Sequence, residues 1–340
     1  MAKVITMGEM MARLMPSNNL RIEQAPSFDV FYGGDESIVA TSLARFGLSS
    51  HYVTKLPDNA LGRAARNHLR AQGVNTDFII FGGERLGLNF YENGASIRPS
   101  VVIYDRKSSA IAETQLSDFD FKTIFSDADW FHISGITPAL SRNTALLTEK
   151  ALSTAKGKGV TVSVDLNYRR KLWAPEKARE VMTPLMQYVD VCIGNEEDAE
   201  IMLGFKPKNT DVHKGDLNIE GYKEIFLQMH DKFKFKVIAS TLRESISASD
   251  NRWSALVFDG KDFFVSRKYN IHLVDRGGGG ASFSAGLIYG MLNDMPMEQA
   301  TEFAVAASAL KQTILGDFNL VTVDEVVQLM GGDISGRVQR

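Results

Sequence analysis

Short runs of apolar, β-branched residues alternate along the chain with longer stretches in which apolar residues recur at helical spacing. The stretches 36–46 and 59–72 place apolar residues three or four positions apart and stop at a glycine, as amphipathic helices do. This alternation of strand and helix predicts a parallel sheet with crossover helices. The strand-like runs lie at 4–8, 52–54, 130–133, 160–165, 189–193 and 237–240.

The alternation is interrupted between residues 78 and 106, where several short strand-like runs lie close together. Asn93-Gly94 separates two of them, and Asn-Gly is a frequent sequence in tight hairpins. We expect a small antiparallel sheet, formed by residues 12–32 and 84–108, inserted into one α/β domain that spans residues 1–340. A sheet inserted in this way is expected to act as a lid over a cleft.

The alternation of strand and helix resumes after residue 129. Pro175 stands in the first turn of one predicted helix, where its missing N–H is tolerated. Residues 206–215 are expected to form a surface loop, and 255–258 with 263–265 a hairpin. The other helices predicted in this half lie at 144–156, 196–203, 220–232, 282–292, 297–313 and 323–330.

The composition is that of an ordinary globular protein, with 44% hydrophobic and 23% charged residues among 340. The 38 Lys and Arg nearly balance 41 Asp and Glu, so the net charge of −3 gives no indication of a nucleic-acid or membrane partner. Cys192 is the single cysteine of the sequence, which excludes an internal disulfide and fits a reducing compartment. No long apolar span or signal-peptide pattern occurs, and we expect a cytoplasmic protein.

Four consecutive glycines, Gly277 to Gly280, follow a strand-like run at 270–274 and precede an apolar helix of small residues. Such a layout leaves bare backbone N–H groups at a helix N-terminus, where the helix dipole is positive and an anion can approach closely. Phosphate is the anion that this loop predicts. At the start of the helix, where an acidic residue is expected, the chain has Ala281.

Polar residues stand at the ends of several predicted strands. Ligands of open α/β sheets bind beyond these C-terminal ends, so clusters at successive strand ends predict one shared site. The chain has no GxxxxGK[ST] phosphate loop, and its glycines come too late for the dinucleotide fingerprint. His132, within an apolar run, is expected to be a core residue rather than a metal ligand. The strand-end clusters are Gly33-Gly34, Asp165 with Asn167 and Arg169, Asn195 to Asp198, Thr241 to Glu244, and Asp275 to Gly280.

Taken together, these motifs resemble those of the ribokinase-like (PfkB) carbohydrate kinases along nearly the whole chain, and within them the 2-keto-3-deoxygluconate kinases. Several long motifs occur in the family's order and at its spacing, which makes the resemblance specific. They are Gly33-Gly34 with 42–47 (SLARFG), 94–100 (GASIRPS) with 104–106 (YDR), 165–169 (DLNYR), 194–200 (GNEEDAE), 241–245 (TLRES) and 275–280 (DRGGGG).

The resemblance implies a ribokinase-like three-layer α/β fold, with a mainly parallel central sheet and a small antiparallel lid that closes on the sugar. It also implies a kinase that uses ATP and Mg²⁺ to phosphorylate a hydroxyl of a sugar acid such as 2-keto-3-deoxygluconate. A monovalent cation stays open as a further cofactor. A homodimer formed through the lid sheet is the assembly that the family leads us to expect.

The resemblance further assigns roles to positions of this chain. Gly278, Gly279 and Gly280 would form the anion hole for the transferred phosphoryl group. The substrate would be contacted by Gly33, Gly34, Ile38, Asn89, Tyr104, Arg106 and Arg169, with the Arg169 guanidinium meeting its carboxylate. The nucleotide would be contacted by Asn195 and Asp198 near Mg²⁺ through water, by Thr241 and Arg243 near the phosphates and ribose, and by Ser308 to Asn319 at the adenine.

Four positions depart from the family's pattern. The family has an Asp in the place of Ala281, and this Asp takes the proton from the attacking hydroxyl, which alanine cannot do. Ile38 stands for a polar Asn, Asn89 for a Tyr, and Gly277 for a Val or Thr. Loss of a positioned general base removes roughly 10²–10⁴-fold in rate.

Three interpretations fit these departures: an engineered inactive variant, a natural pseudokinase that binds without turnover, and an enzyme whose base has moved. Asp35, beside the sugar glycines, is the nearby candidate for a substitute base, although a solvated turn residue is the simpler interpretation. A purely structural dimer built through the lid is a further alternative. We expect the scaffold to bind nucleotide and sugar acid while phosphoryl transfer is abolished or much reduced.

Overall fold

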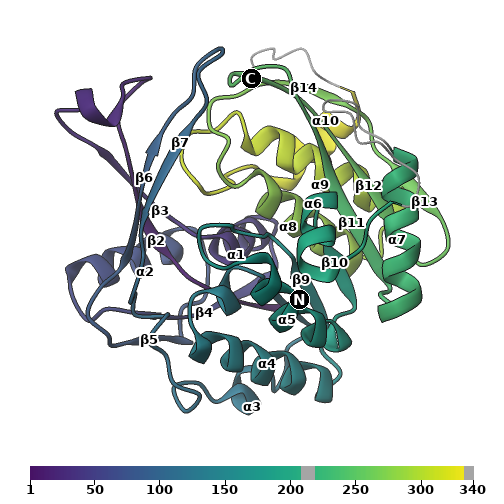
Figure 1. Cartoon of the computed structure of the whole chain (residues 1–340), viewed down its shortest axis with the longest axis horizontal. Coiled ribbons are helices and arrows are strands. Elements are labelled where there is room, and N and C mark those ends of the chain that lie inside the picture. The colour runs from purple at the N-terminus through teal and green to yellow at the C-terminus, as the bar shows by residue number, and fades with distance from the viewer. Residues whose placement is uncertain (208–218, 333–340) are drawn as a thin grey trace.

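The computed structural model describes residues 1–207 and 219–332, so most of the loop predicted at 206–215 lies outside the described residues. The main sheet contains β1 (Lys3–Met7), β4 (Ser49–Leu56), β5 (Ile79–Phe81), β8 (Trp130–Ser134), β9 (Thr161–Asp165), β10 (Val191–Ile193), β11 (Val237–Ser245), β12 (Asp250–Phe258), β13 (Phe263–Val265) and β14 (Tyr269–His272). Its order is β13-β12-β11-β10-β9-β8-β1-β4-β5, with β14 also paired to β12 (Figure 1). The strands from β5 to β11 pair in parallel, whereas β12 is antiparallel to its three partners. The predicted mainly parallel sheet is therefore confirmed.

Helices cover both faces of this sheet, as the predicted three layers require. Successive strand residues alternate between two hydrophobic cores: Val191 and Ile193 belong to one core, and Cys192 between them belongs to the other. The first core lies under α1 (Asp35–Arg45), α2 (Ala60–Ala71), α8 (Gly279–Leu292), α9 (Met297–Lys311) and α10 (Val323–Met330), and the second under α3 (Phe121–Ile124), α4 (Arg142–Gly157), α5 (Pro175–Leu185) and α7 (Ile219–Phe233).

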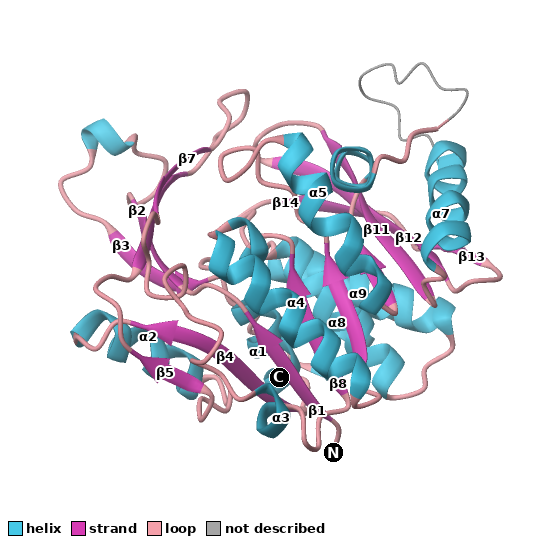
Figure 2. Cartoon of the chain, turned by 60° about the horizontal axis from the view of Figure 1, so that its bottom comes forward, coloured by secondary structure: helices cyan, strands magenta, loops and turns pink. Residues whose placement is uncertain are grey.

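A second sheet of four strands, called the lid sheet here after its predicted role, stands apart from the main sheet (Figure 2). Its strands, in the order β3-β2-β6-β7, are β3 (Asp29–Gly33), β2 (Met11–Met15), β6 (Gly87–Glu92) and β7 (Val101–Asp105). The two outer pairs are antiparallel as predicted. The central pair of β2 and β6 is parallel, because each of these strands follows a strand of the parallel main sheet along the chain.

Three local predictions were wrong. The first short run of the interrupted stretch 78–106, at residues 78–81, does not belong with the runs that follow it, because β5 pairs in parallel with β4 at the edge of the main sheet. Asn93-Gly94 does not form a two-residue hairpin, since β6 and β7 are joined by residues 93–100 with an Ala95–Arg98 bridge. β11 continues to Ser245 instead of stopping at 240, because its pairing with the antiparallel β12 extends beyond the parallel strands.

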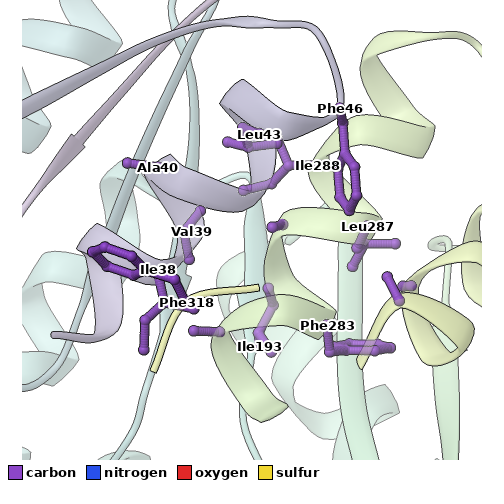
Figure 3. Close-up of a cluster of buried hydrophobic side chains, with 14 of the residues drawn as sticks. Ile38, Val39, Ala40, Leu43, Phe46, Ile193, Phe283, Leu287, Ile288 and Phe318 are labelled. Atoms are coloured by element: carbon purple, nitrogen blue, oxygen red, sulfur yellow. The ribbon is translucent and has the colours of Figure 1, made fainter. Parts of the chain in front are cut away.

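Close packing fixes the position of α8, the helix that begins with the glycine run. A Cβ added at Gly286 would lie 2.6 Å from the Ala304 Cα, so glycine allows α8 and α9 to approach this closely. On another side, Leu287 and Ile288 lie toward the apolar side chains of α1, such as Leu43 (Figure 3). The N-terminus of α8 is thereby held at a defined place beside the strand ends.

Candidate active site

A cavity of about 540 Å³ is lined both by residues beyond the ends of the central strands and by residues of the lid sheet. The residues that follow β1, β8, β9 and β10 contribute to it, as expected for an open α/β sheet. Nearly all predicted site residues meet in this cavity, namely Gly33, Gly34, Ile38, Asn89, Tyr104, Arg106, Arg169, Asn195, Asp198, Thr241, Arg243, Gly278, Gly279, Gly280 and Ala281.

The helix α8 begins in this cavity, one turn earlier than the sequence indicated. Gly278 is its N-cap with a left-handed φ of 79°, and Gly279 and Gly280 belong to its first turn. A Cβ added at Gly280 would meet no atom within 4 Å, so this position faces open space. The first N–H groups of an α-helix have no partner within the helix, and here they belong to cavity-lining residues. This end of the cavity is suited to an anion.

Asp275 connects the glycine run to the lid sheet. Its carboxylate accepts hydrogen bonds from the N–H groups of Gly277 (2.8 Å) and Gly316 (3.0 Å), and forms an ion pair with Arg13 of β2. Arg13 Nη1 also lies 2.9 Å from Asp317 Oδ1. The Arg13 and Asp275 side chains are only 3% and 0% exposed, so their charges compensate each other in the interior. The sequence did not reveal Arg13, which stands 262 positions from its partner.

Two arginines line the cavity near the glycines. Burial and the neighbouring Arg276 both lower the pKa of Arg243, and Glu196 offsets part of this effect. Arg276 Nε is buried without a hydrogen-bond partner. Two guanidinium groups that repel each other beside a helix N-terminus form a positive region that a polyphosphate would neutralise.

Glu36, near the start of α1, lines the cavity and accepts three hydrogen bonds at one carboxylate oxygen. Its Oε1 accepts from the Ser134 N–H (2.9 Å), the Ser134 hydroxyl (2.8 Å) and the Thr137 hydroxyl (2.8 Å). Burial and the neighbouring Asp35 raise the pKa of Glu36 to about 7. Glu36 therefore links α1 to the end of β8 and changes protonation near neutral pH.

Asp35 is not the solvated turn residue of the simpler interpretation. It is the first residue of α1, lines the cavity, and has its Oδ2 buried without a hydrogen-bond partner. Burial raises the pKa of both Asp35 and Asp165, while the charge of Arg169 opposes the rise. Arg169, which was predicted to bind the substrate carboxylate, therefore already offsets the negative charges of Asp35 and Asp165.

One row of side chains crosses the lid sheet and lines the cavity. Arg13 pairs in register with Asn89, and Asn89 pairs with Tyr104. Residues in register on neighbouring strands point to the same face of a sheet, and all three line the cavity. Asn89 thus lies at the centre of the lid's inner face, with Arg13 on the neighbouring strand on one side and Tyr104 on the other.

Arg106 also lines the cavity, but its guanidinium is engaged by Glu9. Arg106 Nε lies 2.7 Å from Glu9 Oε2, Arg106 Nη2 pairs with the same oxygen, and the Ser109 hydroxyl donates to Glu9 Oε1 at 2.6 Å. Glu9 was not recognised in the sequence as a site residue. A contact of Arg106 with the sugar stays a prediction, and its charge is compensated before any ligand binds.

Asn195 and Asp198 cap each other at the start of α6 (Glu196–Asp198). Asn195 Oδ1 accepts from the Asp198 N–H (2.9 Å), and the Asp198 carboxylate accepts from the N–H groups of Asn195 (3.2 Å) and Tyr168 (2.9 Å). No three His, Cys, Asp or Glu side chains gather as a metal site among the described residues. Magnesium retains several waters and uses few carboxylates plus substrate phosphates. These two residues therefore fit an ion that arrives with a nucleotide and is contacted through water.

Ser308 and Asn319 do not line the cavity. The Ser308 hydroxyl donates to the Gly279 carbonyl at 2.7 Å, and Asn319 Oδ1 accepts from the Val321 N–H at 3.3 Å. Both side chains are fully buried, so they support α8 and the turn after 319 from within the core. Between them, Asp317 is the residue that does reach the cavity.

Two other expectations concern residues away from this site. His132 is buried with Nδ1 2.8 Å from the Ser163 hydroxyl, and burial lowers its pKa to about 3, so it is the neutral core histidine that was predicted. Cys192 is fully buried, and burial raises the pKa of its thiol. None of the helices in the described ranges combines the length and apolarity that a membrane span needs.

Comparison with known proteins finds relatives over nearly the whole chain. The sequence model described as pfkB family carbohydrate kinase matches residues 1–317. The chain is 33% identical over 338 residues to a 2-dehydro-3-deoxygalactonokinase of Haloferax volcanii, with 98% of each chain covered. The crystal structure of a 2-dehydro-3-deoxygluconokinase from Thermotoga maritima matches with a TM-score of 0.94 and 50% identity, over 98% of this chain and 100% of that one.

A more distant structure shares the fold and was solved with nucleotide. This putative ribokinase II from E. coli, in complex with ATP and Mg²⁺, matches with a TM-score of 0.82 and 19% identity, over 98% of this chain and 100% of that one. The ribokinase-like fold predicted from the sequence motifs is confirmed by these matches.

Proposed function

Because the chain belongs to the pfkB family of carbohydrate kinases, we propose that its cavity binds MgATP and a sugar acid such as 2-keto-3-deoxygluconate, with phosphoryl transfer abolished or much reduced. One observation carries this proposal. The glycine N-terminus of α8 opens into the cavity, and the third residue of that helix is Ala281, which lines the cavity without offering a proton acceptor.

The phosphate part of the proposal rests on positive groups gathered around the glycines. The first turn of α8 supplies N–H groups, Gly280 leaves space, and Arg243 and Arg276 stand close enough to repel each other. Catalysis of phosphoryl transfer consists mainly of positioning and of stabilising charge on the transferred group. Mg²⁺ bound to the nucleotide would add to that charge stabilisation, with Asn195 and Asp198 holding its waters.

The sugar part rests on Asn89 and Tyr104 of the lid sheet and on Arg169, which offsets the acids of α1 and β9. A substrate carboxylate would compete with Asp35 and Asp165 for the guanidinium of Arg169. Because burial already raises the pKa of both acids, a bound carboxylate favours their protonation instead of repelling two full charges. The cavity can therefore accept an acidic sugar at Arg169.

The attacking hydroxyl would still need to lose its proton. Ala281 is 2% exposed and ends in a methyl group, so nothing at this position can take it. A positioned base contributes roughly 10²–10⁴-fold, and the oriented charges that remain would leave a slow residual transfer. Asp35 is the rival acceptor, since it lines the same cavity with one oxygen unpartnered.

Calorimetric titration with MgATP and with 2-keto-3-deoxygluconate tests the binding part directly. Binding of both supports the proposal, and binding of neither would leave the alternative of a purely structural protein. A coupled assay on the same sample tests the chemistry, because turnover of about 1–100 s⁻¹ is normal for kinases and would contradict the proposal. If slow turnover is found, Asp35→Asn decides whether Asp35 is its base.

A non-catalytic role as a binding or regulatory pseudokinase is the second candidate, favoured by the same Ala281. For the assembly we propose a homodimer through the outer face of the lid sheet, where Val101 and Ile103 of β7 are 44% and 50% exposed. Light scattering with Ile103→Lys tests this, since a charge there would favour the monomer. A cytoplasmic location remains an expectation that fits the buried thiol of Cys192.

A further inference from the structure

Lys311, the last residue of α9, has a side chain that is fully buried. Its ammonium donates to the backbone carbonyls of Gly316 (2.6 Å) and Ile314 (3.2 Å). Burial lowers the pKa of Lys311 to about 8, and the charges of Asp275 and Asp317 oppose the decrease. The group therefore carries its proton at pH 7, and an ammonium is hidden in the interior beneath the cavity.

The surroundings of this ammonium are those of a cation site. Two carbonyl oxygens contact it and two carboxylates lie near, which is the oxygen-rich environment in which proteins hold hard cations. The carbonyl of Gly316 faces Lys311 while the N–H of the same residue donates to Asp275. Asp275 in turn accepts from Gly277. A short chain of contacts thus runs from the ammonium to the glycine run.

The Lys311 side chain also touches the glycine run from below. A Cβ added at Gly278 would lie 3.2 Å from Lys311 Cε and 2.5 Å from the Asp317 carbonyl oxygen. The lysine stem therefore occupies the space under the N-cap of α8. Loss of its charge would leave two carbonyls without their donor, and Arg13 alone would then compensate Asp275 and Asp317 directly behind the proposed phosphate site.

We infer that Lys311 is a tethered monovalent cation: its ammonium occupies the oxygen-lined site under the glycine run, so the protein needs no free potassium or sodium ion to order its phosphate-binding loop. The monovalent cation that the sequence left open does not fit beside it, because the carbonyl oxygens of Ile314 and Gly316 are already taken. Lys311 is a positioning residue in this account. The inference rests on the proposed function only where nucleotide binding is the readout.

The first experiment uses the unmodified protein. We expect its thermal midpoint and its affinity for MgATP to be unchanged when choline chloride is replaced by KCl or NH4Cl at equal ionic strength. An affinity that rises about tenfold with potassium, the size of an ordinary coupling between two sites, would overturn the inference. If MgATP does not bind at all, the proposed function fails, and the thermal midpoint still reports on the cation.

The second experiment uses two variants that separate charge from space. Lys311→Ala removes both, and we expect a lower thermal midpoint and about tenfold weaker MgATP binding in choline chloride, both recovered when K⁺ or NH4⁺ enters the vacated space. Lys311→Met removes the charge and fills the space, so the same salts should not rescue it. An alanine variant that folds but ignores K⁺ and NH4⁺ would overturn the inference. If Lys311→Ala does not fold in any of these salts, the experiment on the unmodified protein decides whether the inference holds.

Discussion

The two ends of the cavity, where we propose that phosphate and sugar bind, are built from different kinds of group. At the proposed phosphate end, the glycine run before α8 is held by a buried network in which Asp275, Arg13, Asp317 and Lys311 compensate one another. At the proposed sugar end, single side chains would carry the chemistry: Ile38 and Asn89 line it, and Ala281 stands where it meets the first turn of α8. Ile38 is 5% exposed and packs among apolar side chains near Phe318 (Figure 3).

This difference teaches which part of a kinase site is sensitive to substitution. A network of buried charges is costly to change at any one member, because each removal leaves a partner uncompensated. A proton acceptor at a cavity wall can be replaced by a methyl group with little effect on folding. The fold and the glycine run can therefore persist in a protein that has lost the proposed transfer.

Restoring an acid at position 281 should have the largest effect. We expect Ala281→Asp to raise the rate of phosphoryl transfer by about 10²–10⁴-fold, equivalent to about 3–5 kcal/mol of barrier. An acid in the first turn of a helix also interacts favourably with the dipole. Steady-state assays with Ala281→Asn as control separate the base from a change in size. Equal rates for both variants would place the defect at Ile38 or Asn89 as well.

Removing a member of the buried network should change the free energy of unfolding by nearly as much as the acid at position 281 changes the barrier to transfer. Arg13→Met keeps the apolar stem and removes the cation that pairs directly with Asp275 and Asp317, so we expect a loss of about 3–5 kcal/mol in the free energy of unfolding. Urea denaturation measures it. The control Arg63→Met breaks an exposed pair with Asp58, 3.4 Å apart, and should cost at most about 0.5 kcal/mol. Similar losses of stability for Arg13→Met and Arg63→Met would contradict the view that the buried network is costly to change.

The acids of the sugar end should make stability depend on pH. Glu36 has a folded pKa of about 7, above its unfolded value of 4.5, so its contribution is complete below 4.5 and is lost as the pH rises through 7. Relative to Glu36→Gln, the protein should lose on the order of 2 kcal/mol between pH 5 and 8. Denaturation at both pH values measures this, with the exposed Glu149→Gln as control. If the difference in stability between the protein and Glu36→Gln is the same at pH 5 and pH 8, Glu36 is ionised at both pH values.

The smallest effect concerns the open space at the phosphate end. Gly280→Ala should bind MgATP about tenfold more weakly, or about 1.4 kcal/mol, because its methyl group enters the cavity. It should fold at least as well, since alanine is the better helix former. The control is Gly157→Ala in α4, where an added Cβ also meets no atom within 4 Å. Unchanged affinity for Gly280→Ala would mean that phosphate binds elsewhere.

Local pattern was sufficient to predict most of the fold. The runs of β-branched residues at 4–8 and 189–193 became β1 and β10, because alternate residues of a central strand enter two cores and both must be apolar. The run at 79–81 looked equally strand-like, but its partner is β4 and not the neighbouring runs. Pairing partners distant in the chain leave no local signal.

The candidate site was predictable where motifs stand at strand ends, and hidden where charges meet across the fold. Hidden residues include Arg13 and Glu9, which each pair with a charge that is remote in sequence, and Lys311, which binds backbone carbonyls. The residues next to them in the sequence give no sign of these contacts. Ser308 shows the limit of a resemblance, which places it at the adenine, whereas its hydroxyl is bonded to the Gly279 carbonyl within the core.

A rapid-quench single-turnover experiment tests the central claim most directly. Excess protein is mixed with limiting labelled MgATP and saturating 2-keto-3-deoxygluconate, so the rate of phosphoryl transfer is observed without product release. We expect the nucleotide to bind and transfer to proceed well below about 1 s⁻¹, the lower end for kinases, because Ala281 offers no proton acceptor. A burst of phosphorylated sugar at about 1–100 s⁻¹ would contradict the account.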